Sequence, residues 1–396
     1  MKIYVDNAAT TKMSPAAIQA MLTCFDRIYG NPSSLHSIGQ QAADAVYEAR
    51  TQIAACLGCH PKEIIFTSGG SEADNQAILT AARIGARKGK KHILSTPIEH
   101  HAVLHTLQRL QKEGFSIEYL PVNSFGEITP KQVADAIRPD TALVTVMYAN
   151  NEIGTILPVP EIGRLCARRQ VLFHTDAVQA VGHLPIHVKQ QEIQMLSLSA
   201  HKFHGPKGIG VLYAQKGIPV ASLIEGGGQE GGRRAGTENV PAILGMAAAL
   251  KESCLHMEEN SSKVSSLRSR LLDGLLQIPH SALNGSPDCR LPGNINICFE
   301  GIEGERLLLA LDQQGICASA GSACTASSAD PSHVLRAIGL PHELARGSLR
   351  ISLCADNTIE EIEKVIGAVT QAVASLRDHS PLWKEKCEGL KPFLLK

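Results

Sequence analysis

The chain has 396 residues, 44% of them hydrophobic, and its 38 Lys and Arg side chains balance 38 Asp and Glu side chains. A net charge of zero excludes the electrostatic footprint that duplex nucleic acid or an anionic membrane surface would require, so small-molecule chemistry is expected. The length favours a large domain with a smaller companion over one compact core.

The sequence also indicates a soluble, cytoplasmic protein. It shows no charged and then apolar leader, and no apolar stretch long enough to cross a bilayer. Its eleven cysteines are an odd number with irregular spacing, which fits poorly with the disulfide framework of a secreted protein. We therefore expect reduced thiols, and neither nucleic acid nor a membrane among the partners.

Short apolar segments alternate with amphipathic segments in the first part of the chain. The apolar segments predict buried strands at 64–67, 92–95, 116–120, 142–146, 171–174 and 195–198. The amphipathic segments predict helices at 72–88, 100–113 and 160–169. Such alternation is typical of an α/β fold with a mostly parallel sheet covered on both faces, in which ligands bind at the carboxyl ends of the strands.

The pattern changes after about residue 250. Helices are predicted at 257–276, 305–314 and 359–376, with a strand at 295–299. We expect a second domain here. The predicted division is a large domain over 15–255 and a small domain over 1–14 and 256–396.

Two residues that follow neighbouring predicted strands suggest cofactor chemistry. Asp176 comes directly after the strand at 171–174, and Lys202 follows the strand at 195–198. An amine can hold a carbonyl cofactor as a Schiff base, and a carboxylate can pair with the protonated ring nitrogen of pyridoxal phosphate. Each residue alone has an ordinary alternative, a solvated lysine or a turn aspartate. Together they favour a pyridoxal-phosphate enzyme.

Residues 67–75 offer a place for the phosphate of such a cofactor. A strand ends there in glycines, and a helix is predicted to begin at Ser71, with Asp74 at capping-box spacing. The amides of Gly70 and Ser71 can cradle a phosphate, and an ordinary helix cap is the alternative.

Polar residues beside these segments extend the candidate site. Ser199 and His201 flank Lys202 and can bind phosphate. His100 opens a helix after a strand, where it can stack on a flat cofactor and move protons near neutral pH. The adjacent His101 is interpreted as a surface or helix-capping residue.

Cys324 lies in a loop of small residues, over about 318–330. Gly, Ala and Ser leave little apolar area to bury there, so mobility is expected, and a thiol on such a tether can carry an atom away from a cofactor. The segment 56–60 matches a haem-attachment pattern by letter but has no second ligand pair, so no metal site is predicted.

Ordered motifs along nearly the whole chain resemble the class-V pyridoxal-phosphate enzymes, and among them the cysteine desulfurases of iron–sulfur cluster assembly and nitrogenase maturation. The motifs lie at 4–11, 30–34, 67–75, 99–100, 150–154, 176–179, 201–202, 234–237, 321–324 and 348–352. The resemblance implies the fold type I of pyridoxal-phosphate-dependent transferases. This fold has a large domain with a mostly parallel seven-stranded sheet flanked by helices, and a smaller α+β domain.

The resemblance also implies a role for each site residue. Lys202 would form the Schiff base, Asp176 would pair with the pyridine nitrogen, and His100 would stack over the ring. Asn151 and Gln179 would lie near the ring substituents. The residues expected to hold the phosphate are Gly70, Ser71, Ser199, His201 and, from the neighbouring subunit of a homodimer, Thr237.

The implied activity is the removal of sulfur from L-cysteine. Asn31 and Arg350 would grip the substrate carboxylate, a role that suits the guanidinium fork. Lys202, His100 and Cys324 would be the catalytic residues, with alanine and a Cys324 persulfide as products. The persulfide would pass its sulfur to an iron–sulfur scaffold or another acceptor protein, and Cys324 could also ligate a transferred cluster.

Other functions stay open at this point. A selenocysteine lyase or a related class-V aminotransferase would keep Lys202 and Asp176. A metal or iron–sulfur scaffold would use Cys324 with Cys56 and Cys59, and would leave Lys202 without a purpose. The tail around Trp383 resembles the family's docking segment for a scaffold protein, and simple packing of Trp383 is the alternative.

Overall fold

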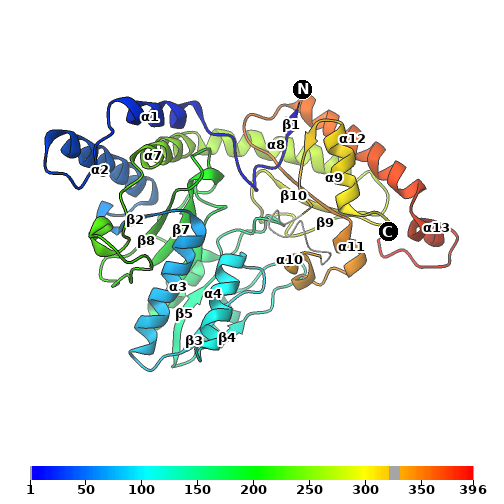
Figure 1. The fold of residues 1–396 in the computed structure, drawn as a ribbon. Coiled ribbons are helices and arrows are strands. Elements are labelled where there is room, and N and C mark those ends of the chain that lie inside the picture. The colour runs from blue at the N-terminus through cyan, green and yellow to red at the C-terminus, as the bar shows by residue number, and fades with distance from the viewer. Residues whose placement is uncertain (1, 321–330, 396) are drawn as a thin grey trace.

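A seven-stranded sheet forms the centre of the fold (Figure 1), in a computed structural model that describes residues 2–320 and 331–395. In spatial order the strands are β2 (Ile64–Thr67), β8 (Gly210–Ala214), β7 (Met195–Ser199), β6 (Leu172–Asp176), β5 (Thr141–Thr145), β3 (His92–Ser95) and β4 (Ser116–Tyr119). Neighbouring strands run parallel except at β8, which is antiparallel to β2 and β7. The predicted mostly parallel sheet is confirmed, and β8 adds a strand that the apolar pattern does not predict.

Alternate residues of each strand pack against helices on opposite faces of the sheet. Ile65 and Ile93 share a core with α3 (Gly70–Ala86) and α4 (His101–Lys112) on one face. Phe66 and Leu94 belong to the core of the other face. Because both faces are covered, the strands are continuous apolar runs rather than alternating ones.

Five further helices surround this sheet. They are α1 (Pro15–Asp26), α2 (Ser37–Leu57), α5 (Pro130–Ala136), α6 (Val159–Arg169) and α7 (Val240–Leu255). Figure 1 shows α1, α2 and α7 grouped at one end of the molecule, where α7 packs against both of the others. Gly58 is the C-cap of α2 and has a left-handed φ of 68°. A side chain at this position would clash with the His187 ring. The chain then passes through the short turn η1 (Pro61–Glu63) into β2.

A second apolar core lies beside the first. Its centre is an antiparallel sheet in the order β12 (Ser348–Ser352), β10 (Asn294–Phe299), β9 (Ser281–Leu283). The helices around it are α8 (Met257–Leu275), α9 (Gly304–Gln313) and α12 (Ile359–Asp378). The short helices α10 (His333–Ala337) and α11 (His342–Arg346) place Val334, Leu335 and Ala345 in the first core instead. Ile3 and Val5 join this core, and β1 (Ile3–Tyr4) pairs in parallel with β11 (Ile316–Cys317). The amino-terminal segment therefore packs with the last third of the chain.

The carboxyl-terminal segment folds back onto this second core. Helix α13 (Pro381–Cys387) places the Trp383 ring 5.3 Å from that of Phe393, and both rings contact His280. The buried carboxylate of Glu300 accepts hydrogen bonds from Lys386 and from the N–H groups of two residues near the end of the tail. Trp383 thus has a packing role within the chain.

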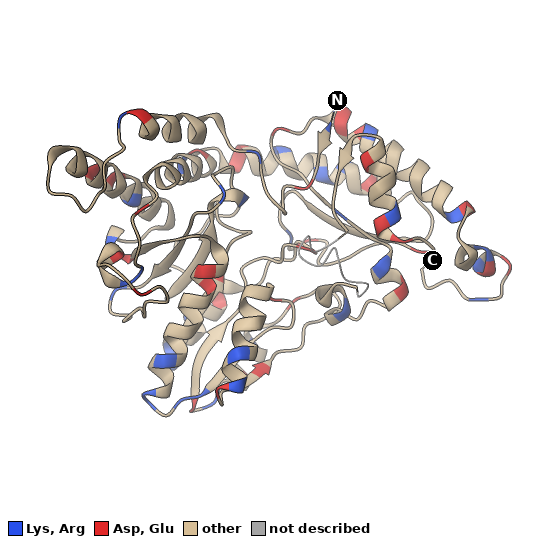
Figure 2. Ribbon diagram, viewed as in Figure 1, with Lys and Arg blue, Asp and Glu red and all other residues tan. Residues whose placement is uncertain are grey.

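Charges of both signs are spread over the surface helices (Figure 2). Helices α3, α12 and α13 each carry acidic and basic side chains, in keeping with a net charge of zero. In the part of the chain that the structure describes, no helix has the length and apolar character needed to span a bilayer.

Glu230 ties a glycine-rich segment to the edge of the sheet, and we expect its removal to destabilise the fold. Its carboxylate accepts hydrogen bonds from the Arg50 guanidinium at 2.8 and 2.5 Å and from the N–H of Phe66 at 3.1 Å. Glu230→Ala leaves a largely buried guanidinium without its counter-charge, which lowers the free energy of unfolding by about 3 kcal/mol in urea titrations.

The matched control is an exposed ion pair. Arg109 and Glu113 are 63% and 48% exposed, so Glu113→Ala is expected to cost below about 1 kcal/mol. Equal losses in Glu113→Ala and Glu230→Ala would contradict the stabilising role of the buried pair.

Candidate active site

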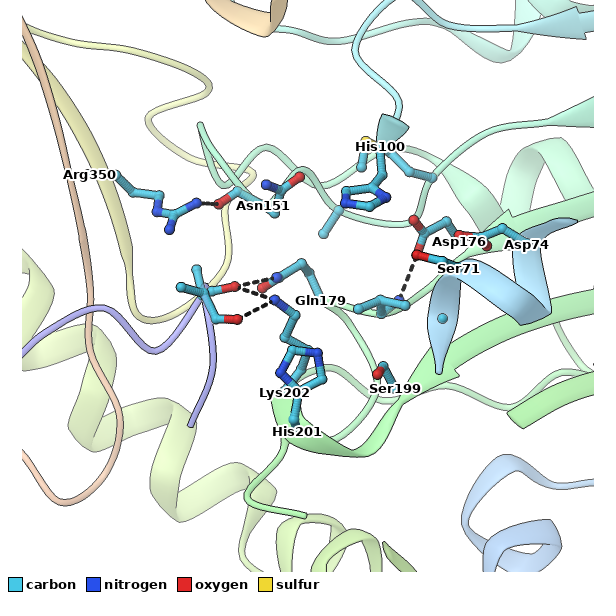
Figure 3. Close-up of a pocket in the computed structure, with 16 residues that line it drawn as sticks. Ser71, Asp74, His100, Asn151, Asp176, Gln179, Ser199, His201, Lys202 and Arg350 are labelled. Atoms are coloured by element: carbon cyan, nitrogen blue, oxygen red, sulfur yellow. Dashed lines mark hydrogen bonds between the residues drawn. The ribbon is translucent and has the colours of Figure 1, made fainter. Parts of the chain in front are cut away.

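A cavity of about 270 Å³ opens where the parallel strands end (Figure 3). Its walls come from the segments that follow β2, β3, β5, β6 and β7, together with the amino-terminal segment and β12. The lining residues are Ala8, Ala9, Gly70, Ser71, Asp74, His100, Met147, Ala149, Asn151, Asp176, Val178, Gln179, Ser199, His201, Lys202 and Arg350. The structure therefore brings most of the site residues predicted from the sequence into one cavity.

Three of the predicted site residues are not part of this wall. Asn31 and Thr237 are exposed, and neither lines the cavity of this chain. Cys324 lies outside the residues that the structure describes.

Lys202 enters the cavity from a short turn after β7. The turn η2 (Ala200–Lys202) packs tightly against Gly205, where a Cβ atom would lie 2.8 Å from that of Ala200. The Nζ atom of Lys202 donates hydrogen bonds to the carbonyl oxygens of Ala8 at 2.6 Å and Ala9 at 2.8 Å. The amino-terminal segment thus orients the amine.

Asp176 is the last residue of β6 and is 5% exposed. Its Oδ1 atom accepts a hydrogen bond from the N–H of Val178 at 2.9 Å. Burial raises the pKa of Asp176, while His100, the Val178 N–H and Lys202 act in the opposite direction. Three groups that favour the charged form therefore surround this one carboxyl group.

His100 serves both the helix and the cavity. Its Nδ1 atom accepts the N–H of Ala102 at 3.2 Å, so His100, rather than His101, is the N-cap of α4. Burial lowers the pKa of His100, so the imidazole is neutral at pH 7. A neutral ring in the wall can both stack on a flat ligand and exchange a proton with it.

The phosphate end of the cavity is built differently from the prediction. Helix α3 begins at Gly70, with Gly69 as N-cap and no side-chain cap, so the predicted start at Ser71 and the capping box with Asp74 are wrong. The first amides of a helix have no intrahelical partner and attract anions. Ser71, Ser199 and His201 line this same end of the cavity, so the cradle is formed by amides and hydroxyl groups.

His201 also belongs to this end of the cavity. Its Nδ1 atom lies 3.1 Å from Oγ1 of Thr10, and burial lowers its pKa to about 4. The ring is therefore neutral at pH 7 and acts as a hydrogen-bonding group rather than a charge.

Arg350 closes the side of the cavity that belongs to the second core. It lies in β12, is 1% exposed, and donates to Oδ1 of Asp6 at 2.8 Å and to the carbonyl oxygen of Asn151 at 3.2 Å. Its Nε atom has no hydrogen-bond partner among the described residues. A buried guanidinium with donor capacity left over suits a carboxylate ligand.

Two acidic residues of the site are missed by the sequence pattern. Asp74 is one helical turn after Gly70 and therefore faces the cavity, and it is 1% exposed. Glu99 lies in the connection between β3 and α4. Its Oε1 atom accepts hydrogen bonds from Thr96 at 2.7 Å and from the N–H of Met147 at 3.0 Å. The helical spacing from Gly70 is the signal that could have identified Asp74.

These groups fit pyridoxal phosphate. The cavity offers an amine, a buried carboxylate, a neutral imidazole and a helix N-terminus, which match the aldehyde, ring nitrogen, ring face and phosphate of that cofactor. Gly70 leaves no room for a side chain, because a Cβ atom there would lie 2.6 Å from the Val178 side chain.

Residues 3–365 match the aminotransferase class-V family. The chain belongs to this family. It is 50% identical over 380 residues to the cysteine desulfurase IscS of Methanosarcina thermophila, covering 96% of this chain and 94% of that protein. It is 46% identical over 383 residues to the cysteine desulfurase NifS of Azotobacter vinelandii, covering 96% and 95%.

Solved structures agree with these relatives. A protein described as NifS-like matches with a TM-score of 0.89 at 38% identity, over 95% of this chain and all 100% of that one. SspA in complex with cysteine matches with a TM-score of 0.79 at 37% identity, over 90% and 100%. The protein is thus an enzyme of the cysteine desulfurase group that depends on pyridoxal phosphate, and the predicted fold, enzyme class and cofactor are confirmed.

The geometry also bears on the metal-scaffold alternative. Within residues 2–320 and 331–395, one group of side chains has three possible metal-ligand atoms close together, and it consists of Asp74, His100 and Asp176. Cys56 and Cys59 do not belong to this group.

We expect Glu99 to make the fold less stable as the pH rises. Burial raises its pKa to about 8 from an ordinary value of 4.5, so the folded state holds a proton that the unfolded chain releases between these values. Stability is therefore lost as the pH increases from about 4.5 to about 8. Glu99→Gln keeps an acceptor for Thr96 and Met147 but does not titrate.

The measurement is the free energy of unfolding of both proteins from pH 5 to pH 8.5. We expect the difference between Glu99→Gln and the parent protein to move in favour of the variant as the pH rises. A difference that stays constant over this range would show that Glu99 is ionised throughout.

Proposed function

We propose that this enzyme removes sulfur from free L-cysteine, and that it forms L-alanine and a persulfide on Cys324. The observation that carries the proposal is the placement of the Lys202 amine, the Asp176 carboxyl group and the Arg350 guanidinium in the walls of one cavity. When bound, pyridoxal phosphate withdraws electrons from the α-carbon of an attached amino acid.

Lys202 would hold the cofactor through its amine and would also serve as the base for the α-proton. Its hydrogen bonds to Ala8 and Ala9 keep the amine inside the cavity, where it could take the proton from the α-carbon and return it to the product. Asp176 would supply the negative charge that pairs with a protonated ring nitrogen. Gln179 fixes the same amino-terminal segment through its bond to the Ala8 carbonyl at 3.0 Å.

Arg350 orients the substrate by its carboxylate. The bonds to Asp6 and Asn151 already hold the guanidinium in place, so little side-chain entropy is lost when a carboxylate binds. We propose that Asn31 completes this subsite.

Cys324 takes the sulfur atom. Its thiolate attacks the sulfur of the bound cysteine, an S–S bond forms, and the C–S bond breaks with its electron pair left on the substrate. Protonation of the substrate carbon then yields alanine. The neutral imidazole of His100 can accept the thiol proton at the start of this step.

The described residues on either side of 321–330 support this role. Ser319 exchanges two backbone hydrogen bonds with Arg350, at 3.2 and 2.6 Å. On the far side, a ring nitrogen of His333 lies 3.0 Å from the carbonyl oxygen of Glu99. Ser319 and His333, which flank residues 321–330, are thus bonded to Arg350 of the cavity wall and to the residue that precedes His100.

Two variants separate cofactor attachment from sulfur transfer. Lys202→Ala is expected to lose the absorption band of the covalently attached cofactor, because no other amine lines the cavity among the described residues. Cys324→Ser is expected to keep that band and to release no sulfide from cysteine in the presence of a reductant. Full sulfide release by Cys324→Ser would refute the role of the thiol.

We further propose that the enzyme is a homodimer. Large apolar side chains are exposed along α1, α2 and their connection: Ile18 42%, Leu22 53%, Phe25 66%, Tyr29 69%, Leu35 92% and Tyr47 62%. Large apolar side chains exposed on two helices that pack around α7 favour contact with a second protein chain over solvent. A dimer would let Thr237 of the partner subunit reach the phosphate end of this cavity.

A charge in this surface is expected to separate the subunits. Phe25→Asp buries a carboxylate in the interface, so light scattering after size-exclusion chromatography should report a monomer with weakened cofactor retention. Leu309→Asp is the matched control, since Leu309 is 67% exposed on α9 and outside this surface. A dimeric Phe25→Asp would place the interface elsewhere.

The persulfide sulfur would pass to scaffold or other acceptor proteins for iron–sulfur cluster synthesis. The ten cysteines of the described residues are all free, which supports the proposed location in the reducing cytoplasm. The apolar cores support the proposed domains, 15–255 for the cofactor and 1–14 with 256–396 for the Cys324 loop, because one core contains only residues of the second range. The other two cores consist mainly of residues 15–255, and Leu291, Val334, Leu335, Ile338 and Ala345 of the second range join one of them.

A further inference from the structure

Two buried carboxyl groups, Asp74 and Asp176, lie in the wall of the cavity, and a third, Glu99, is buried outside that wall. Asp74, Glu99 and Asp176 are 1%, 0% and 5% exposed. An oxygen of Asp74, an oxygen of Asp176 and a ring nitrogen of His100 all lie within 4.8 Å of one another. Carboxylates this close in a water-poor site cannot all be ionised, because their repulsion adds to the cost of burying each charge.

The groups that act on Asp74 supply no compensating charge. The charged groups that act on Asp74 are both acids, Asp176 in β6 and Glu99 before α4, and both raise its pKa. The imidazole of His174, also in β6, lies 3.6 Å from Oδ1 of Asp74, but burial lowers the pKa of His174 to about 3 and leaves the ring neutral. The cations, Lys202 after β7 and any protonated His100, act instead on Asp176.

Few hydrogen bonds are available to an ionised carboxylate at Asp74. Ser197 is the one group that lowers the pKa of Asp74, against burial, Asp176 and Glu99, which all raise it. The Ser197 hydroxyl also lies 2.9 Å from a ring nitrogen of His174, whose other nitrogen lies 2.8 Å from the Thr145 hydroxyl. The Oδ1 atom of Asp74 itself has no hydrogen-bond partner among the described residues. An ionised oxygen left in this way would be far more costly than a neutral one.

We propose that Asp74 is a positioning residue that carries a proton at neutral pH, and that it thereby leaves Asp176 as the anion that pairs with the cofactor ring. It acts through Asp176 and the Ser197–His174–Thr145 chain rather than on the substrate. Burial first and Asp176 second raise the pKa of Asp74 well above its usual range, in agreement with this assignment. The inference rests on the role of Asp176 under the proposed function.

The proton on Asp74 has a consequence for the cofactor. Two carboxylates at this wall would repel each other, and one of them would take a proton from the ring nitrogen or from solvent. With the proton already stored on Asp74, Asp176 stays charged over the working pH range and the ring nitrogen stays protonated.

Infrared spectroscopy of the full chain without cofactor tests the protonation directly. A protonated carboxyl group has a C=O stretch that a carboxylate lacks, so the parent protein at pH 7 should show bands for both Asp74 and Glu99. Asp74→Asn should remove one band, and Glu99→Gln, the matched control, should remove the other. If the spectrum of Asp74→Asn keeps every protonated-carboxyl band of the parent protein, the proposal is overturned.

The pairing with Asp176 has its own signature. In Asp176→Asn the repulsion disappears, so the Asp74 band should titrate at a pH lower by roughly one unit or more than in the parent protein. The titration is made in the Glu99→Gln background, where the band of Glu99 is absent. It needs no substitution of Asp74, so it tests the protonation of Asp74 even if Asp74→Asn does not fold. An unchanged midpoint would show that Asp74 and Asp176 are not coupled.

The loaded enzyme provides an independent readout. Asp74→Asn exchanges one neutral group for another, so the pH midpoint of the cofactor absorption spectrum should stay close to that of the parent protein. If Asp74 were ionised in the parent protein, Asp74→Asn would remove a negative charge and would shift this pH midpoint by roughly one unit or more. Failure of the chain to bind pyridoxal phosphate would refute the proposed function and leave the infrared result standing, so the two failures are distinguishable.

Discussion

The guanidinium of Arg350 holds together the two halves of the site. It is buried in β12 of the second core, yet its hydrogen bonds reach Asp6 of the amino-terminal segment and the backbone of Asn151 after β5 of the first core. The same amino-terminal segment supplies the carbonyl oxygens that orient Lys202. The position of the catalytic amine thus depends on how the second core docks against the strand ends, and Arg350 contributes directly to that docking.

Several titratable groups in and beside the cavity are uncharged. Burial keeps the imidazoles of His100, His174 and His201 neutral, and it favours the protonated forms of Asp74 and Glu99. Asp176, Lys202 and Arg350 are the groups of the cavity for which the proposed cofactor and substrate would provide a partner. A water-poor site in which few groups are charged makes each electrostatic contact with the cofactor and the substrate stronger.

The sequence pattern predicted the strands of the sheet well, because a strand covered on both faces becomes an apolar run such as 142–146. It missed β8, which has no helix before it. The connection from β7 is a short turn through 203–209, which allows antiparallel pairing without a crossover. It also missed α7, whose apolar residues lie on several sides because the helix is buried between α1 and α2.

At the site, the chemistry of Lys202, Asp176 and His100 was readable from their places at strand ends. The start of α3 was not, because serine and aspartate at capping-box spacing occur equally well when the helix begins one residue earlier. Because the helix begins one position earlier, Asp74 is a buried residue in the wall of the cavity rather than part of a helix cap. Local propensity does not contain the packing that decides such a choice.

The sequence by itself determined the α/β class, because strand periodicity is a local property of the chain, and the order of its motifs determined the family. The tertiary structure alone decided that Arg350, Ala8 and Ala9 meet Lys202 at one cavity, and that Asp74 and Glu99 lie buried beside Asp176. Those contacts join segments that are far apart in the sequence. They change the protonation of the groups through desolvation and proximity, which exist only once the chain has folded.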